Sequence, residues 1–315
     1  MDILKLFLVI PCYNEQEVLP ITAQKLQEKM ANLIMAGKIA PDSQIVFVDD
    51  GSKDKTWEYI CAMNKANPLF RGIKLAHNKG HQNALVAGMM TVRDECDAII
   101  SMDADLQDDI NAVDEMIERC YEGCDIVYGV RSARKTDTAF KRGTAHGFYS
   151  LMKLMGVEIV NDHADYRLMT KRALSAFADY EEVNLFLCGL IPMLGYKTAT
   201  VEYERGERAA GESKYPLKKM IAFALEGITS MSVKPIRLVT FLGVFIFSIS
   251  ALMLLYSLIR HWTGNTVEGW TSTVVSIWAI GGLQLLSIGV IGEYIGKIYL
   301  ETKRRPKFTI EEYIK

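Results

Sequence analysis

Residues 97–109 read Asp97-Ala-Ile-Ile-Ser-Met-Asp103-Ala-Asp105-Leu-Gln107-Asp-Asp109, an apolar, strand-like run that ends in a cluster of carboxylates. On an extended backbone, carboxylates two residues apart point to the same side, which suits one hard divalent cation. Magnesium keeps most of its water and is commonly held by one or two protein carboxylates together with substrate phosphates. The stretch therefore predicts a strand end where a divalent metal meets a phosphorylated substrate.

Short apolar runs alternate with amphipathic helical patterns upstream and downstream of this stretch. The alternation predicts an α/β domain with a mostly parallel sheet, which binds ligands beyond the carboxyl ends of its strands. Neither GxGxxG nor GxxxxGK[ST] occurs, so dinucleotide and phosphate-loop sites are not expected. The expected strands are 6–10, 44–48, 72–76, 97–102 and 125–130, and the expected helices are 16–35, 55–65, 81–93 and 110–121.

Two runs near the C-terminus, 238–259 and 270–292, contain no charged residue. Each is long enough to cross a bilayer core of about 30 Å as a helix, and a polar turn joins them. They predict a transmembrane hairpin; a pair of core helices in a soluble protein is the alternative. Lysine and arginine flank the outer ends, whereas the turn offers only Arg260, so both termini are expected in the cytoplasm.

Two further stretches, 140–156 and 215–231, have apolar residues at helical spacing beside lysine and arginine, and the second of them completes an expected organisation in four parts. Core packing explains either pattern, but the second leads into the first span and favours a helix lying on the membrane surface. The parts are a cytoplasmic α/β domain (1–210), a juxtamembrane amphipathic helix (211–235), the hairpin (236–300, with spans at about 236–259 and 270–292) and a cytoplasmic tail (301–315).

Four motifs follow successive predicted strands in a fixed order. They are Pro11-Cys-Tyr13-Asn-Glu15, Val48-Asp49-Asp50-Gly-Ser-Lys-Asp54, His77-Asn-Lys79-Gly80 and Asp103-Ala-Asp105. This ordered set resembles the family 2 glycosyltransferases of the GT-A fold, over about residues 6–214. The resemblance narrows to the membrane-anchored polyprenyl-phosphate glycosyltransferases, such as bacterial undecaprenyl-phosphate glucosyltransferases and dolichyl-phosphate mannose synthases. It does so through the motifs at 77–84, 103–108, 164–169 and 205–215 and through the hairpin.

The resemblance implies transfer of one sugar from a nucleotide-sugar to a polyprenyl phosphate. It implies a divalent metal, Mg²⁺ or Mn²⁺, at Asp103, Asp105 and Gln107. It also implies a role for Asp105 in catalysis, and no nucleic-acid partner. The positions that it assigns to the nucleotide-sugar are Pro11, Tyr13, Glu15, Asp49, Asp50, Lys79 and Asp103.

The resemblance offers Asp165 as a catalytic base. A base needs a proton to remove, and a phosphomonoester whose second pKa is about 6 is largely dianionic at neutral pH. We therefore expect Asp165 to orient a sugar hydroxyl or Arg167; a purely structural pair with Arg167 is the alternative. The lipid phosphate is expected at Arg131, Arg134, Arg205, Arg208 and Lys214, although attraction to anionic lipid also explains such charges.

The expected activity is an inverting, metal-dependent transfer on the cytoplasmic face of the cell membrane, with UDP-glucose as the first candidate donor. Two alternatives stay open: a processive polysaccharide synthase and a membrane-anchored nucleotide-sugar-binding scaffold without turnover. The first is disfavoured because no Gln-x-x-Arg-Trp motif occurs. Glycines in the second span, such as Gly281 and Gly289, allow close helix contact, so homo-oligomerisation is expected.

Overall fold

The computed structural model describes residues 3–132, 152, 154–156, 163–204, 206, 227–262 and 269–315. Four expected lipid-phosphate residues, Arg134, Arg205, Arg208 and Lys214, lie outside the described residues, as do most of the stretches 140–156 and 215–231. The strands are β1 (Leu6–Cys12), β2 (Gln44–Asp49), β3 (Phe70–Leu75), β4 (Ala98–Ser101), β5 (Ile126–Arg131), β6 (His163–Thr170), β7 (Thr198–Tyr203) and β8 (Ile310–Ile314).

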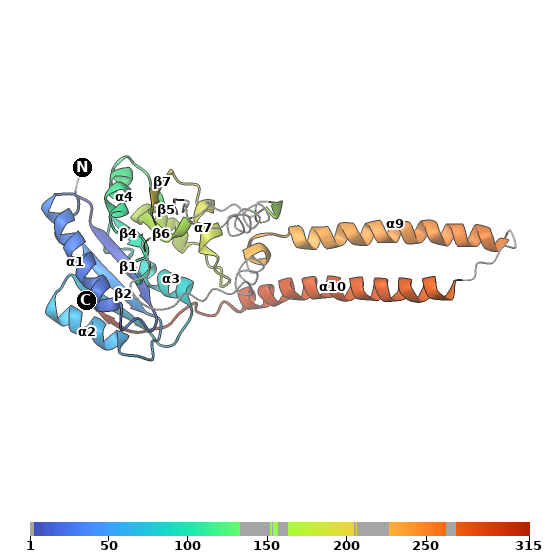
Figure 1. Ribbon diagram of the computed structural model, residues 1–315, viewed down its shortest axis with the longest axis horizontal. Coiled ribbons are helices and arrows are strands. Elements are labelled where there is room, and N and C mark those ends of the chain that lie inside the picture. The colour runs from blue at the N-terminus through green and yellow to red at the C-terminus, as the bar shows by residue number, and fades with distance from the viewer. Residues whose placement is uncertain are drawn as a thin grey trace.

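The described strands form one sheet in the order β7-β5-β6-β4-β1-β2-β3-β8 (Figure 1). Its centre is parallel, because β1 pairs with β2 and β4, and β2 pairs with β3. β6 runs antiparallel to both β4 and β5, and β8 runs antiparallel to β3. The helices are α1 (Leu19–Met35), α2 (Thr56–Ala66), α3 (His81–Val92), α4 (Ala112–Tyr121), α6 (Lys171–Ala178), α7 (Leu187–Met193), α9 (Lys234–Trp262) and α10 (Trp270–Lys303).

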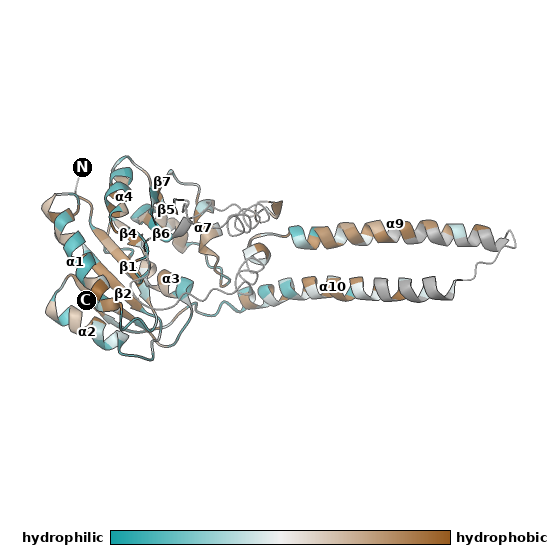
Figure 2. Cartoon of the chain, in the orientation of Figure 1, coloured by the Kyte–Doolittle hydropathy of each residue, from teal (hydrophilic) through white to brown (hydrophobic). Residues whose placement is uncertain are grey.

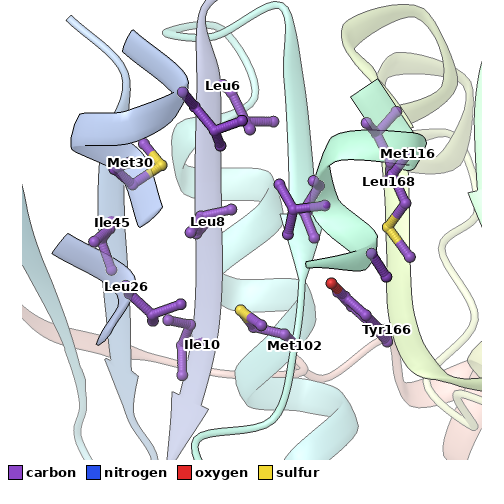
Figure 3. Close-up of a cluster of buried hydrophobic side chains, with 14 of the residues drawn as sticks. Leu6, Leu8, Ile10, Leu26, Met30, Ile45, Met102, Met116, Tyr166 and Leu168 are labelled. Carbon is purple, nitrogen blue, oxygen red and sulfur yellow. The ribbon is translucent and has the colours of Figure 1, made fainter. Parts of the chain in front are cut away.

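Apolar side chains cover both faces of the sheet, as expected for strands buried in a three-layer domain. On one face, Leu6, Leu8 and Ile10 of β1 lie toward α1, with Leu26 and Met30 opposite them (Figure 3). On the other face, alternate residues of the same strand pack in a second cluster with α3, α6 and α7. Every strand and helix expected between residues 6 and 130 is present, with bounds shifted by a few residues.

Two long helices, α9 and α10, project from one end of the domain and contact each other (Figure 1). Brown, apolar residues follow one another along their coloured parts (Figure 2). Within the described residues, one helical stretch, Ile280–Lys303, is long and apolar enough to cross a membrane. α10 is continuous well past residue 292, where the expected second span ends, so its last turns run toward the α/β domain.

The segment after α10 returns to the sheet, which the sequence analysis did not predict. β8 pairs with β3, and Thr309 accepts a hydrogen bond from the Ala76 N–H at 2.9 Å. Arg71 of β3 donates to the Tyr313 hydroxyl at 2.7 Å and forms an ion pair with Glu95. Residues 310–314 are therefore an edge strand of the α/β domain.

Glu301, near the end of α10, binds the loop that leads into α7. Its carboxylate accepts hydrogen bonds from the N–H groups of Val183 and Asn184, both at 2.8 Å, and from the Asn184 amide at 2.6 Å. Hydrogen bonds to a charged acceptor are stronger than those between neutral groups. The C-terminal end of α10 is thus joined to the domain by a carboxylate contact as well as by β8.

Candidate functional site

Polar loops meet at one edge of the sheet, beyond the carboxyl ends of β1, β2 and β4. The alignment follows from parallel pairing, which brings these strand ends together. Two groups of side chains and loops can be distinguished there. The Asp50 cluster consists of residues 13–15, 49–54 and 77–80, and the Asp103 cluster consists of Asp103, Asp105, Asp165, His81 and Arg167.

The loop after β1 is held in shape by the loop after β2. Asn14 has a positive φ of 55°, donates its N–H to the Ser52 hydroxyl at 2.9 Å, and accepts from the Lys53 N–H at 2.8 Å. The Glu15 N–H donates to the Thr56 hydroxyl at 2.9 Å. A shallow pocket of about 450 Å³, lined by Asn14, Glu15, Lys53 and neighbouring residues, opens beside these loops.

Asp50 fixes the loop after β3 to the loop after β2. Its two carboxylate oxygens accept hydrogen bonds from the Lys79 N–H at 2.7 Å and the Gly80 N–H at 2.9 Å. Gly51, at φ +67°, allows this approach, since a Cβ there would lie 2.7 Å from the Asn78 nitrogen. Burial raises the pKa of Asp50, whereas the two backbone hydrogen bonds lower it.

Four other expected nucleotide-sugar residues surround this arrangement. Asp49 is fully buried, and its Oδ1 accepts from the Ser52 N–H at 3.2 Å. Tyr13 is 42% exposed, and Pro11 lies within β1. The Lys79 backbone is held by Asp50. The structure therefore uses Asp49 and Asp50 to shape the loops, while Tyr13 presents its ring to solvent.

Asp103 and Asp105 lie in a turn after β4, not on an extended backbone as the sequence analysis assumed. β4 ends at Ser101, and Leu106 has a positive φ of 57°. Asp105 Oδ1 accepts a hydrogen bond from the Gln107 N–H at 3.1 Å, which closes the turn. The backbone that carries the expected metal residues is therefore a turn, and this hydrogen bond links two of them, Asp105 and Gln107.

Negative charge accumulates around Asp103. Burial, followed by the charges of Asp108, Asp165 and Asp105, raises its pKa to about 6, although His81 lowers it. Carboxylate oxygens are the ligands that Mg²⁺ and Mn²⁺ prefer, and a cation at this point would relieve the repulsion. Within the described residues, no three acidic, histidine or cysteine side chains form a complete metal site. The residues present fit a metal that shares its coordination with a substrate.

Asp165 lies beside Asp103 because β6 pairs with β4. The Ser101 hydroxyl donates to the Asp165 carbonyl at 2.6 Å. Asp165 Oδ1 accepts from Arg167, whose side chain is fully buried. Its other oxygen, Oδ2, is 3.2 Å from Nε2 of His81, and the same nitrogen is 3.6 Å from Asp103 Oδ1.

His81 is a member of the site that sequence reasoning missed. Burial lowers its pKa, but the hydrogen bond to Asp165 and the charges of Asp103 and Asp165 raise it to about 9. The available signal was its position, since it directly follows Gly80 at the carboxyl end of a predicted strand. A second unpredicted residue is Tyr203, whose hydroxyl donates to Asp108 at 2.5 Å.

Arg131 is the one expected lipid-phosphate residue within the described part of the chain. It donates from Nε to the Tyr203 hydroxyl at 3.3 Å, and a terminal nitrogen lies 3.7 Å from Asp108 Oδ1. Its side chain is 31% exposed. The structure places Arg131 close to the Asp103 cluster and in contact with an acidic neighbour of Gln107.

Fold and site together define an α/β domain with two carboxylate clusters beyond the carboxyl ends of its central parallel strands. The profile of Glycosyl transferase family 2 matches residues 7–177. The chain is 52% identical over 306 residues to the uncharacterised glycosyltransferase YkoT of Bacillus subtilis (strain 168), covering 97% of this chain and 91% of YkoT. It is 40% identical over 311 residues to the bactoprenol glucosyl transferase of Shigella phage SfV, covering 98% of each.

The chain belongs to glycosyl transferase family 2 and is a glycosyltransferase. Its α/β domain is of the GT-A type, as the sequence predicted. Among solved structures, glucosyl-3-phosphoglycerate synthase of Mycobacterium tuberculosis has a TM-score of 0.44 at 14% identity, covering 72% of this chain and 78% of that chain.

Proposed function

We propose that this protein transfers a single sugar from a nucleotide-sugar to a polyprenyl phosphate, with inversion at the anomeric carbon. Undecaprenyl phosphate is the proposed acceptor and UDP-glucose the first donor to test. The proposal draws on relatives named bactoprenol glucosyl transferase, which match nearly the whole chain. The observation that carries it is the ordered set of carboxylates beyond β1, β2 and β4.

Each cluster has a part in the proposed reaction. Tyr13 and Glu15, on the loop held by the residues that follow β2, would contact the nucleoside. Asp103, Asp105 and Gln107 would hold Mg²⁺ or Mn²⁺, which neutralises the leaving nucleoside diphosphate when bound. The three residues lie in one short turn, and the Asp103 carboxylate is 35% exposed, so a substrate can reach it.

Asp165 is proposed to orient groups rather than to remove a proton. One of its oxygens accepts from Arg167, and the other lies 3.2 Å from the imidazole of His81. A carboxylate held by two donors is a weak base, and a dianionic phosphate needs none. Arg131, with Arg134, Arg205, Arg208 and Lys214, would position the lipid phosphate.

The proposed enzyme is an integral protein of the cell membrane. α9 contains the charge-free run 238–259, and α10 contains 270–292. We propose that both helices cross the bilayer, with the catalytic domain and both termini in the cytoplasm. A Cβ at Gly281 or Gly289 would meet no atom within 4 Å, which leaves room for a second copy against α10. Light scattering of the purified protein would give the order of assembly.

The test is transfer by the purified, full-length protein in detergent. Radiolabelled UDP-glucose, UDP-N-acetylglucosamine, GDP-mannose and UDP-aminoarabinose are each incubated with undecaprenyl phosphate and Mg²⁺ or Mn²⁺. We expect one lipid-linked monosaccharide, formed only with lipid and lost with EDTA. A polymer would indicate a processive synthase, and donor binding without product would indicate a scaffold. Asp105→Asn protein is the control for contaminating activity.

A further inference from the structure

His81 lies where the two clusters meet. It is the first residue of α3, directly after Gly80, whose N–H donates to Asp50 at 2.9 Å. Gly51 fits closely against the backbone of His77 and Asn78, so the loop that carries His81 cannot shift freely. The position of the imidazole is therefore set by the Asp50 cluster.

The imidazole faces two carboxylates from two other strands. Nε2 is 3.2 Å from Oδ2 of Asp165, which lies in β6. The same nitrogen is 3.6 Å from Oδ1 of Asp103, which lies in the turn after β4. The first distance is that of a hydrogen bond, and the second is that of a charge contact. His81 is thus the side chain that bridges the expected metal ligand and Asp165.

The start of a helix does not by itself explain a histidine there. The N-terminal end of a helix carries partial positive charge and favours acidic or hydroxyl side chains. An imidazole at the first position of α3 gains nothing from the helix, and its contacts are with the carboxylates. Those carboxylates, in contrast, gain a donor between groups that otherwise repel each other.

We propose that His81 is a positioning residue that holds the Asp165 carboxylate beside Asp103 by donating a hydrogen bond from Nε2. Arg167 holds the opposite oxygen, so the two donors fix both the position and the rotation of the carboxylate. Without His81, repulsion from Asp103 and Asp105 turns Asp165 away from the site. This inference rests on the proposed function for its kinetic test, but not for its structural test.

The kinetic test is a double-mutant cycle in the transfer assay with full-length protein. A misplaced group near reacting atoms costs up to about 100-fold, so we expect His81→Ala to lower kcat by about 10- to 100-fold and by no more than Asp165→Asn does. The KM for the nucleotide-sugar should change less than about threefold, since ground-state binding is unaffected. His81→Gln, which keeps an N–H donor, should recover about tenfold of the loss.

The cycle separates action through Asp165 from a separate role. If His81 acts through Asp165, then His81→Ala adds almost nothing to Asp165→Asn, because the carboxylate that it holds is already gone. Additive losses would show that His81 acts independently of Asp165, and a KM that rises while kcat is kept would show that His81 contacts the donor; either result would overturn the proposal.

The structural test needs no turnover. Crystal structures of metal-free wild-type and His81→Ala protein should differ in the Asp165 side chain, which we expect to turn away from Asp103 in the variant. An unchanged Asp165 overturns the inference, whatever the transfer assay gives. If wild-type protein fails to transfer sugar yet Asp165 moves as expected, then the proposed function fails and the positioning role of His81 stands.

Discussion

The Asp50 cluster and the Asp103 cluster both present carboxylates at the same sheet edge, but the carboxylates of the two clusters are paired with different kinds of groups. Asp50 is bound by two backbone N–H groups of the adjacent loop. Around Asp103, by contrast, burial and the charges of neighbouring acidic side chains raise the pKa of the Asp103 carboxyl group, and the balancing groups are the side chains of His81 and Arg167. The first cluster sets the shape of the loops through backbone hydrogen bonds, and the second gathers acidic side chains beside one histidine and one arginine.

The largest predicted effect would break the Asp103 cluster. Asp105→Asn removes a charged oxygen that is proposed to bind the metal, and a Lewis acid contributes several kcal/mol, so transfer should fall by about 10³-fold or more. Steady-state assays over a range of Mn²⁺ concentrations provide the measurement. Asp109→Asn, in the same loop, is the control and should keep most activity. Wild-type turnover by Asp105→Asn protein would contradict the proposal that Asp105 binds a metal needed for transfer.

Asp165→Asn should have a smaller effect than Asp105→Asn. The variant keeps the shape of the side chain, and a dianionic acceptor offers no proton to remove, so we expect a loss of about 10- to 100-fold in kcat. The two variants are compared in the same assay at saturating donor. Equal and complete loss in both would show that a strong base is required after all.

Gly51→Ala tests the backbone design of the Asp50 cluster. Its added Cβ meets the His77–Asn78 backbone and its φ is +67°, so the free energy of unfolding should fall by about 1–3 kcal/mol. The KM for the donor should also rise. Gly37→Ala is the matched control, because Gly37 has a φ of +66° with no atom near its Cβ position. Thermal unfolding measures the change in stability, and donor titration measures the change in KM. Equal effects of Gly51→Ala and Gly37→Ala would contradict the inferred contact between position 51 and the His77–Asn78 backbone.

The smallest predicted effect concerns the edge strand behind the Asp50 cluster. Tyr313→Phe removes a hydroxyl that accepts from Arg71, which should cost about 0.5–1.5 kcal/mol of stability and leave kcat unchanged. Tyr59→Phe, at a tyrosine that is 42% exposed, is the control and should be neutral. Thermal unfolding of the wild-type protein and the two variants checks this. A large loss of turnover by Tyr313→Phe would contradict the prediction and show that β8 affects the site.

The strands and helices between residues 6 and 130 were predictable from the sequence because burial on both faces produces continuous apolar runs. β6 was missed because its residues were read as a motif, Ala164 to Met169, rather than as a strand. β8 was missed because an edge strand is half exposed and its sequence, Ile310–Ile314, carries two glutamates. Its pairing depends on distant residues of β3, which no local pattern reveals.

The position of the carboxylates was predictable, but their partners were not. Strand ends placed Asp49, Asp50 and Asp103 at one edge, as the structure confirms. The turn at Leu106, the contact between His81 and Asp165, and the Tyr203–Asp108 hydrogen bond each depend on side-chain directions. Such directions follow from tertiary packing, so sequence spacing alone could not supply them.

β8 also determines when the catalytic domain can finish folding. The strand follows both long helices in the chain, yet it covers the edge of β3. During synthesis the edge of β3 therefore stays unpaired until both helices and β8 have been made. An unpaired edge strand exposes backbone N–H and C=O groups that can pair with another chain, so a truncated protein of residues 1–210 should aggregate. Synthesis of the two long helices and completion of the sheet are thus consecutive events for one chain.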